Sequence, residues 1–341
     1  MKILVVKLGA MGDVLRTTPL LTAFKRLHPD CHITWVVEKS SWVVLQKNSR
    51  IDSLLIYSPE TLKTLSRESF DLAVNLDKED EALDTLMSVR ATQKRGFGRS
   101  KEGKLAPLDA DSDYAYRLGI DDELKFRQNK KTYQEISFEQ LGLRFGGEEY
   151  IFPLENADKA FADAHLKNLG VDLDSARPRI GLNTGSGPRF AGKKLPVASY
   201  ARLAEKIYAQ TGQAALLLGG DTEAQRNLEI QALSKAPVIN TGSHSIGKFA
   251  GIVSACDVVI SGDTIAMHVA IAMKVPVVAF FASTCAAEIE LYGRGKKIVS
   301  PIACAPCYKR LCPIDEQCMK DMTVEEIFDA TRPFIKDRVS S

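Results

Sequence analysis

A short glycine-containing segment follows the first apolar run of the chain and carries the first candidate for chemistry. It reads Lys7-Leu8-Gly9-Ala10-Met11-Gly12-Asp13-Val14-Leu15-Arg16. Glycines let a backbone turn tightly and approach a ligand closely. Asp13 then begins a helix, where its carboxylate either accepts a substrate proton in a cleft or caps the helix. The G-x-x-G spacing differs from the G-x-G-x-x-G dinucleotide fingerprint, which disfavours a NAD site here.

A second segment, residues 260–268, has the composition of a phosphate site. It runs from an apolar strand through Ser261-Gly262-Asp263-Thr264 into an apolar helix that contains His268. The first backbone amides of such a helix and the positive end of its dipole suit a phosphate. Thr264 and His268 are four residues apart and share a helix face. The alternative is a capped core helix with a satisfied histidine.

Two further loops follow predicted strands of the second half. Thr184-Gly185-Ser186 leads to a lysine pair whose first member is Lys193. A lysine there either neutralises a departing diphosphate or is simply solvated. Asp221 and Glu223 follow Gly219-Gly220. Their carboxylates either hold ribose hydroxyls or stabilise a helix start.

Four of the seven cysteines fall within fifteen residues, namely Cys304, Cys307, Cys312 and Cys318. Thiolates at this density make a tetrahedral zinc or iron site. The spacing is not that of a standard zinc finger, so disulfides formed after isolation and free thiols stay open as alternatives. The remaining three cysteines are scattered, which indicates core packing.

The elements that must position these residues alternate between strands and helices, which predicts parallel sheets with helices on both faces. In the first half we expect strands at 2–8, 33–37, 53–57 and 70–76, and helices at 14–28, 40–47, 59–68, 132–145 and 156–169. In the second half we expect strands at 179–183, 214–218, 238–240, 257–261 and 275–281, and helices at 197–211, 222–235, 245–255, 264–273 and 323–337.

This pattern predicts an α/β protein of two Rossmann-like, doubly wound domains, with ligands beyond the carboxyl ends of the strands. The expected bounds are 1–170 and 171–322, with a terminal segment 323–341 whose helix packs back on the first domain. Residues 93–113, rich in glycine and charge, read as a long surface loop. Its basic residues are Lys94, Arg95, Arg99, Lys101 and Lys104.

The composition narrows the class of protein. The 341 residues are 45% hydrophobic and 26% charged, which is typical of globular chains. A net charge of +2, from 45 basic and 43 acidic residues, argues against a nucleic-acid partner. The first apolar run stops at Lys7, too short for a secretion signal, and no run approaches the ~20 apolar residues of a membrane span. We therefore expect a cytoplasmic protein with reduced cysteines.

Taken together and in this order, the motifs resemble those of the family-9 glycosyltransferases, whose best-known members are the lipopolysaccharide heptosyltransferases. The strongest parts are GDVLRTTPLL, SGDTIAMHVAIAMKVPVVAFF and CAPCYKRLC. The resemblance implies a GT-B fold, with two domains facing a central cleft, and an inverting transfer that needs no metal or other cofactor. The chain departs from the family in having Ile265 where glycine is frequent and Leu195 where tryptophan is usual.

The resemblance also implies roles for individual residues. Asp13 matches the proposed general base, and Lys193 matches a lysine that contacts donor phosphate. The family's nucleotide-sugar site matches Asp263, Thr264 and His268 together with Lys193, and its ribose-binding acid maps to Asp221 or Glu223. The small-residue loop Thr184, Gly185 and Ser186 completes the expected donor-binding set on its own composition. Independently of the resemblance, the basic residues of the 93–113 loop, Arg95 and Arg99 among them, either meet phosphates or carboxylates of an anionic lipid-linked acceptor or are solvated. With Gly12 and Arg16 they are the acceptor-binding candidates.

The implied partners are a nucleotide sugar, ADP-heptose by resemblance, and an anionic lipid-linked glycan acceptor. That acceptor would bring the protein to the inner face of the cytoplasmic membrane. A structural zinc or iron at the cysteines is a separate prediction. Three rival hypotheses are a GT-B sugar-nucleotide epimerase, a non-catalytic family member, and a metal- or redox-sensing protein built on the cysteines.

Overall fold

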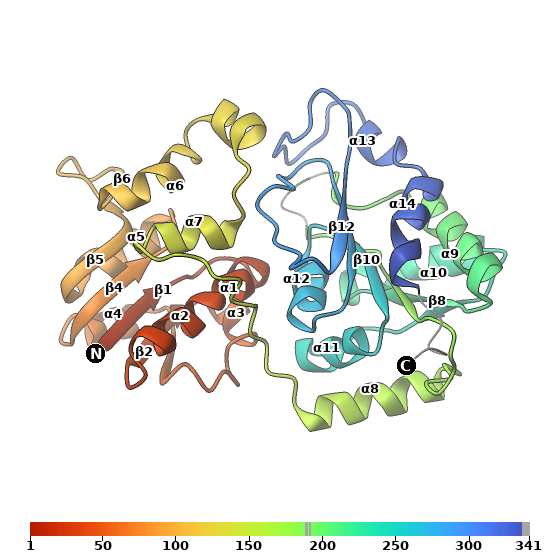
Figure 1. The fold of residues 1–341 in the computed structure, drawn as a ribbon, viewed down its shortest axis with the longest axis horizontal. Coiled ribbons are helices and arrows are strands. Elements are labelled where there is room, and N and C mark those ends of the chain that lie inside the picture. Colours follow the sequence, from red (N-terminus) through yellow and green to blue (C-terminus); the bar gives the residue numbers. More distant parts are fainter. Residues whose placement is uncertain (188–189, 191, 336–341) are drawn as a thin grey trace. The chain divides into compact units, whose positions relative to one another are not determined.

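The computed structural model describes residues 1–187, 190 and 192–335, which form two compact units (Figure 1). Unit 1 comprises Met1–Pro153 together with Ala287–Glu290. Unit 2 comprises Leu154–Ala286 and the described residues from Leu291 onward. The expected boundary at residue 170 is therefore moved earlier, because helix α8 (Asn156–Asn168) packs against α11 (Ile246–Ser254) of unit 2.

Unit 1 is built on a six-stranded sheet in the order β3-β2-β1-β4-β5-β6. Every neighbouring pair is parallel except β5 and β6. Its strands are β1 (Lys2–Val6), β2 (His32–Val37), β3 (Ser53–Ile56), β4 (Ser69–Asn75), β5 (Arg90–Arg99) and β6 (Leu105–Pro107). Its α-helices are α1 (Met11–Thr17), α2 (Pro19–Leu27), α3 (Lys39–Trp42), α4 (Pro59–Leu65), α5 (Asp80–Ser88), α6 (Asp113–Arg117) and α7 (Tyr133–Glu139). The continuous apolar run of β1 is buried because a central parallel strand is covered on both faces.

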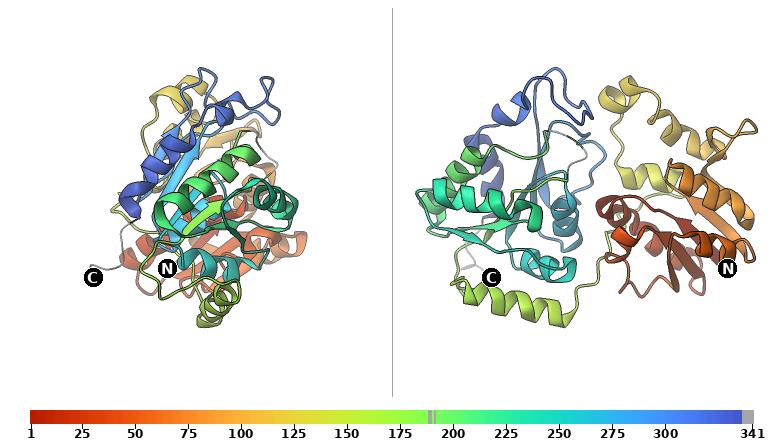
Figure 2. Two further views of the ribbon diagram at one scale, coloured as in Figure 1. Left: turned by 90° about the vertical axis from the view of Figure 1, so that its right-hand side faces the viewer. Right: turned by 180° about the vertical axis from the view of Figure 1, so that it is seen from behind.

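Unit 2 repeats the architecture with an all-parallel sheet in the order β12-β11-β10-β7-β8-β9. Its strands are β7 (Ile180–Asn183), β8 (Ala215–Leu218), β9 (Val238–Asn240), β10 (Val258–Gly262), β11 (Val277–Phe281) and β12 (Gly295–Val299). Its remaining helices are α9 (Val197–Thr211), α10 (Ala224–Leu233), α12 (Ile265–Ala272), α13 (Gln317–Lys320) and α14 (Val324–Thr331). Within unit 2, α9, α10 and α14 lie on one side of the sheet and α11 and α12 on the other (Figures 1 and 2).

Both sheets reverse their strand order at the same place. The first strand of each unit lies beside the fourth, as β1 beside β4 and β7 beside β10. At such a switch point, the loops after the two central strands run in opposite directions and leave a crevice. The segments after β1 and β4, and those after β7 and β10, are thus the positions where ligands of these sheets bind.

The predicted loop at 93–113 is wrong over most of its length. Its first part is the end of β5, which pairs with β6 in an antiparallel hairpin. Phe97 is buried, and a Cβ at Gly98 would collide with the side chain of Leu108. The strand was not predicted because Phe97 is its only large apolar residue, and the other residues are mostly charged, polar or glycine.

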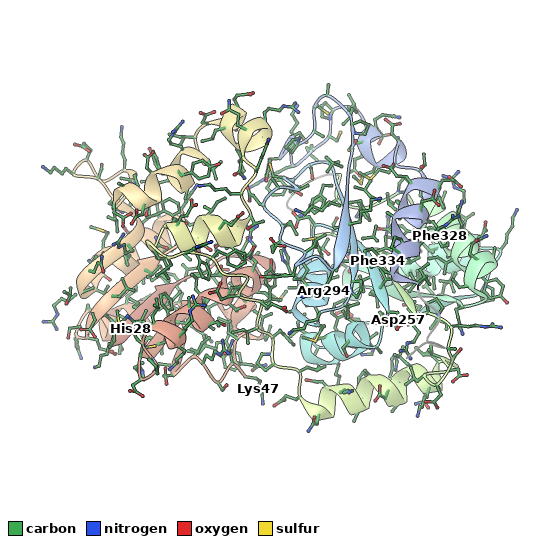
Figure 3. The ribbon with its side chains drawn as sticks, viewed as in Figure 1. His28, Lys47, Asp257, Arg294, Phe328 and Phe334 are labelled. Carbon is green, nitrogen blue, oxygen red and sulfur yellow. The ribbon has the colours of Figure 1, made fainter. Side chains whose placement is uncertain are left out.

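The C-terminal helix packs on unit 2, so the expectation that it returns to the first domain is wrong. Ile327 and Phe328 of α14 are buried in a core cluster with Tyr200 and Leu203 of α9. Figure 3 labels Phe328 on α14 and Phe334 in the turn that follows it. Phe334 packs against the same cluster. The predicted end of this helix at residue 337 lies outside the described residues.

One negative finding concerns membranes. Among the described residues, none of the helices combines the length and the apolarity that a membrane crossing requires.

Truncating Phe328 tests the placement of α14. We expect Phe328→Ala to lower the free energy of unfolding by about 3–5 kcal/mol, because it removes a buried ring and leaves a cavity. Denaturant unfolding measures the change. Leu233→Ala, at a residue of α10 that is 52% exposed, is the control and should cost less than about 0.5 kcal/mol. A small effect of Phe328→Ala would contradict the packing of α14 on this core.

Candidate functional site

The switch point of unit 2 is held together by Asn183, the last residue of β7. Its buried side-chain amide donates to the carbonyl of Gly185 at 3.0 Å, to Oγ of Ser261 at 3.1 Å and to Oγ1 of Thr264 at 3.0 Å. The amide has only two hydrogens, so these three acceptors share them. Asn183 thereby ties the loop after β7 to the end of β10 and the start of α12.

Lys193, Asp263 and His268 form a charged cluster beside this loop. Nζ of Lys193 lies 3.3 Å from Oδ2 of Asp263, and Nε2 of His268 lies 3.7 Å from Oδ1. Burial alone would raise the pKa of Asp263. The nearby imidazole of His268, the positive charge of Lys193 and the nearby hydroxyl of Thr284 instead hold that pKa far below its usual range. Asp263 is therefore ionised at any working pH and anchors the two basic side chains.

The position of Lys193 depends on a glycine and a buried leucine. A Cβ at Gly262 would meet the backbone carbonyl of Lys193 and the ring of Phe280, so only glycine lets this loop cross the end of β10. Two residues later, Leu195 is fully buried, and Arg226 donates to its carbonyl oxygen. The leucine that replaces the family's usual tryptophan therefore still anchors the loop in the core.

The start of α12 is not capped by its own threonine. Thr264 occupies the N-cap position in an extended conformation and makes no capping hydrogen bond. Its hydroxyl is engaged by Asn183 and lies 3.2 Å from Oγ of Ser261. The simple capping interpretation of this residue is thus wrong. The following residue, half-buried Ile265, has the regular helical backbone of α12, a conformation that does not require glycine.

Of the two acidic candidates after β8, Glu223 lies with the phosphate-site loops. Its carboxylate accepts hydrogen bonds from the amide of Gly220 at 2.9 Å and the hydroxyl of Thr222 at 2.8 Å. A Cβ at Gly185 would meet this carboxylate, so the loops after β7 and β8 touch here. Asp221 is exposed at the first position of a short 3₁₀ turn. The structure therefore brings Glu223 to the loop after β7.

Thr184 is a correction to the predicted donor-binding set. Its side chain is fully buried, and its hydroxyl donates to Oδ1 of Asn227 at 2.5 Å. This buried hydroxyl links the loop after β7 to α10 through Asn227 and is not available to a ligand. Ser186, in contrast, is half-buried at the tip of the loop.

In unit 1, Asp13 lies in the first turn of α1, where Ala10 is the N-cap residue. The capping alternative for Asp13 is therefore wrong. Its Oδ1 atom forms an ion pair with Arg16 at 2.8 Å, and the side chain is 31% exposed. Gly12 lies beside it in the same turn, half-buried. Arg16 is the charge partner of Asp13, and its acceptor-binding role stays a prediction.

Arg16 has two further neighbours that sequence reasoning missed. Its guanidinium carbon lies 3.9 Å from the ring centroid of Tyr133, and NH1 lies 3.8 Å from Oε2 of Glu288. Burial alone would lower the pKa of Arg16, but the charges of Asp13 and Glu288 raise it above its usual value. Arg16 is thus permanently charged between two carboxylates.

A second missed pair is Lys7 with Asp77, at the switch point of unit 1. Lys7 follows β1, Asp77 follows β4, and their side chains form a buried ion pair. The other oxygen of Asp77 accepts the amides of Leu8 at 2.5 Å and Gly9 at 3.0 Å. This pair fixes the turn that leads into α1 and Asp13. A charged residue directly after each of two buried strands was the signal that could have revealed it.

Arg95 and Arg99 are already paired within unit 1. Arg95 lies 2.6 Å from Asp111, and Arg99 contacts Asp84 at 2.6 Å and Asp80 at 2.8 Å. These ion pairs connect β5 to α5 and to the segment that follows β6. An acceptor-binding role for either arginine stays a prediction, and it requires an exchange of partners.

The cysteines do not form the predicted metal site. Across residues 1–187, 190 and 192–335, no group of three or more His, Cys, Asp or Glu side chains is arranged to hold a metal ion. Cys304 is exposed, whereas the other three cysteines of the segment are partly buried. Burial, aided by neighbouring Cys312, raises the pKa of Cys318 to about 11.

Two Rossmann-like units with polar clusters at their switch points define an α/β protein of the GT-B fold. The model of glycosyltransferase family 9 (heptosyltransferase) matches residues 61–317, and the chain belongs to that family. The prediction of fold and family from the sequence is thereby confirmed.

Named relatives support the same family. Lipopolysaccharide heptosyltransferase 1 of Pseudomonas aeruginosa is 24% identical, over 92% of this chain and 87% of that protein. Lipooligosaccharide heptosyltransferase 2 of Campylobacter jejuni is 24% identical, over 55% of this chain and 63% of that protein. The match thus spans less than two thirds of the Campylobacter jejuni relative.

Solved structures support the fold. The family-9 glycosyltransferase of Veillonella parvula superposes with a TM-score of 0.74 at 18% identity, over 100% of this chain and 98% of that one. The ADP-heptose lipopolysaccharide heptosyltransferase II of E. coli superposes with a TM-score of 0.67 at 17% identity, over 98% of both chains.

The depressed pKa of Asp263 predicts a pH dependence of stability. A carboxylate stabilised in this way contributes fully above its unfolded-state pKa of about 3.9, and the contribution is lost as pH falls towards the folded-state value. We expect Asp263→Asn to be less stable than wild type at neutral pH, with a difference that shrinks below about pH 4. Denaturant unfolding over a pH series measures it. Asp122→Asn, at an exposed position, is the control. A difference that stays constant down to pH 2 would contradict the ion-pair cluster.

Proposed function

We propose that this protein transfers a heptose, with inversion, from ADP-heptose to the inner core of lipopolysaccharide or a related glycan. The observation that carries the proposal is the Lys193–Asp263–His268 cluster at the switch point of unit 2. Family membership and the names of the relatives support the sugar, and the E. coli structure is named for ADP-heptose. The identity of donor and acceptor is carried over from those proteins.

In the proposed donor site, the diphosphate lies against the first amides of α12 and the ammonium group of Lys193. Asp263 holds Lys193 at 3.3 Å, so the ammonium is positioned before the donor arrives. Preorganised positive groups of this kind stabilise charge that develops on a leaving diphosphate. Glu223 would bind the ribose hydroxyls from the adjoining loop, with the backbone of Gly185 and the hydroxyl of Ser186 beside it.

In the proposed reaction, an acceptor hydroxyl attacks the anomeric carbon and Asp13 takes its proton. The new carbon–oxygen bond forms as the bond to the diphosphate oxygen breaks, and ADP leaves with the electron pair. A single displacement of this kind inverts the anomeric carbon. Lys193 and the α12 amides would stabilise the departing charge, so the proposal assigns no step to a metal ion or other cofactor.

The acceptor side of the proposal rests on unit 1. An anionic, lipid-linked glycan would bring the reaction to the inner face of the cytoplasmic membrane. Gly12 borders Asp13 in α1 and has no side chain to occupy the space beside the carboxylate. Arg95 and Arg99 could meet acceptor phosphates only by exchanging their present carboxylate partners.

The alternative is a sugar-nucleotide epimerase of the same fold, and a product assay distinguishes it from a transferase. An epimerase converts nucleotide sugar in the absence of an acceptor, whereas the proposed transferase releases ADP in step with acceptor consumption. Measuring both products with and without acceptor separates the two activities.

Replacing the proposed base tests the transfer chemistry. We expect Asp13→Ala to lower turnover by about 10²–10⁴-fold, since the variant has lost a positioned general base. Donor affinity should stay within about threefold of wild type, because the donor is assigned to unit 2. Steady-state kinetics and calorimetric titration with ADP measure the two quantities. Turnover near the wild-type rate would exclude Asp13 as the base.

Two adjacent lysines provide a matched test of the donor site. Lys193→Ala should weaken ADP binding by about 10–100-fold, because it removes a charge-assisted contact to phosphate. Lys194→Ala, one residue along, should leave ADP affinity within about twofold. Calorimetry, or the ADP-dependent rise in melting temperature, reports the difference. Equal effects of the two substitutions would contradict the assigned role of Lys193.

A further inference from the structure

Four residues from the second half of the chain belong to unit 1. Ala287–Glu290 cluster with that unit although the residues before and after them belong to unit 2. The backbone carbonyl of Glu288 accepts the amide of Tyr133, at the start of α7, at 2.9 Å. Ile289 is buried, with 2% exposure. The segment is therefore tied to unit 1 by its main chain.

This anchoring places the Glu288 carboxylate beside Arg16. Oε2 of Glu288 lies 3.8 Å from NH1 of Arg16, while NH2 of Arg16 lies 2.8 Å from Oδ1 of Asp13. The side chains of Arg16 and Glu288 are only 15% and 16% exposed. At such burial, charges interact more strongly than they do in bulk water. One guanidinium thus serves two carboxylates, and only Asp13 is assigned chemistry.

An arginine beside a general base carries a cost for the reaction. A neighbouring guanidinium lowers the pKa of a carboxyl group by about 1–3 units, which weakens it as a proton acceptor. A second carboxylate on the same guanidinium offsets part of that effect. The second carboxylate partly neutralises the positive charge of the guanidinium, and it adds a negative charge near the base. Both contributions make it easier for Asp13 to gain a proton.

We propose that Glu288 is a positioning residue that shares Arg16 with Asp13 and thereby keeps Asp13 basic enough to accept the proton of the acceptor hydroxyl. This inference rests on the proposed function, in which Asp13 is the general base. It assigns a role to a segment that no sequence motif marked, and it explains why a mostly buried arginine stands next to the base.

Other charged and titratable groups around the base must be considered in a pH experiment. Lys7, paired with Asp77, interacts with Asp13 from the end of β1, and Tyr133 and Tyr150 interact with Arg16. Lys78 interacts with Glu288, and burial lowers the pKa of Lys78 to about 8. Titration of Lys78 falls on the alkaline side, so the acid limb of the rate profile is the informative one.

The test is the pH dependence of kcat/KM for wild type and Glu288→Gln. With the second carboxylate neutralised, Arg16 stabilises the ionised form of Asp13 more strongly. We expect the acid limb to move to lower pH by about 0.5–1 unit and the plateau rate to fall about two- to fivefold. The KM for the donor should stay unchanged. Glu288→Asp, which keeps the charge, should restore most of the wild-type profile.

Glu290→Gln is the matched control, because it removes one carboxylate from the same four-residue segment. Its acid limb should coincide with that of wild type. An acid limb in Glu288→Gln that also coincides with wild type, in a variant with an unchanged melting temperature, would overturn the role of Glu288. A shift of equal size in Glu290→Gln would overturn it as well.

A readout without turnover separates this inference from the proposed function. Carbon NMR of the labelled Asp13 carboxyl follows its titration directly in wild type and Glu288→Gln. A lower Asp13 pKa in the variant supports the shared arginine even if Asp13→Ala proves active and the transfer mechanism fails. An unchanged Asp13 pKa overturns the inference while leaving the proposed function intact.

Discussion

Each unit depends on a lysine–aspartate ion pair at the switch point of its sheet. In unit 1, Lys7 follows the first strand and Asp77 follows the fourth. In unit 2, Lys193 lies in the loop after the first strand and Asp263 follows the fourth. Removing charges from water is costly unless each has a partner and its hydrogen bonds are satisfied. The two central loops of each unit are therefore held together by electrostatics where the sheet itself leaves a crevice.

The carboxylates of the two pairs have different partners, and this difference indicates a structural role for Lys7–Asp77 and fits the proposed binding role of Lys193–Asp263. Asp77 accepts backbone amides of the Gly9 turn, and the Lys7 side chain is only 6% exposed. All of these interactions of the pair stabilise the turn that leads from β1 into α1. Asp263 lies beside the side chains of Lys193, His268 and Thr284, and Lys193 is 17% exposed. The side chain of Lys193 is thus more exposed than that of Lys7, which fits the proposed contact of Lys193 with a ligand.

Features that are encoded by contiguous residues were predicted from the sequence, whereas features that depend on distant segments were not. The bounds of α9 and β9 were predicted without error, because their periodicity and flanking residues are contiguous. The strand β5 was missed because Phe97 is its only large buried apolar side chain, and β12 was missed because Ile298 is its only buried residue. Likewise the motifs around Asp13, Lys193 and Asp263 are continuous in sequence. The partners Asp77 and Glu288 come from distant segments that only folding brings together.

The environments of Asp13 and Asp263 favour opposite proposed roles for the same kind of side chain. Asp263 lies between Lys193 and His268, which hold its pKa far below the working range, so it cannot gain a proton during a reaction. It can only anchor positive groups. Asp13 is more exposed, and the cation beside it is shared with another carboxylate. A carboxylate whose cation is shared can be protonated more readily than one held by two basic groups. The charges around each carboxylate therefore support the proposal of proton transfer for Asp13 and of anchoring for Asp263, independently of the motifs that first drew attention to them.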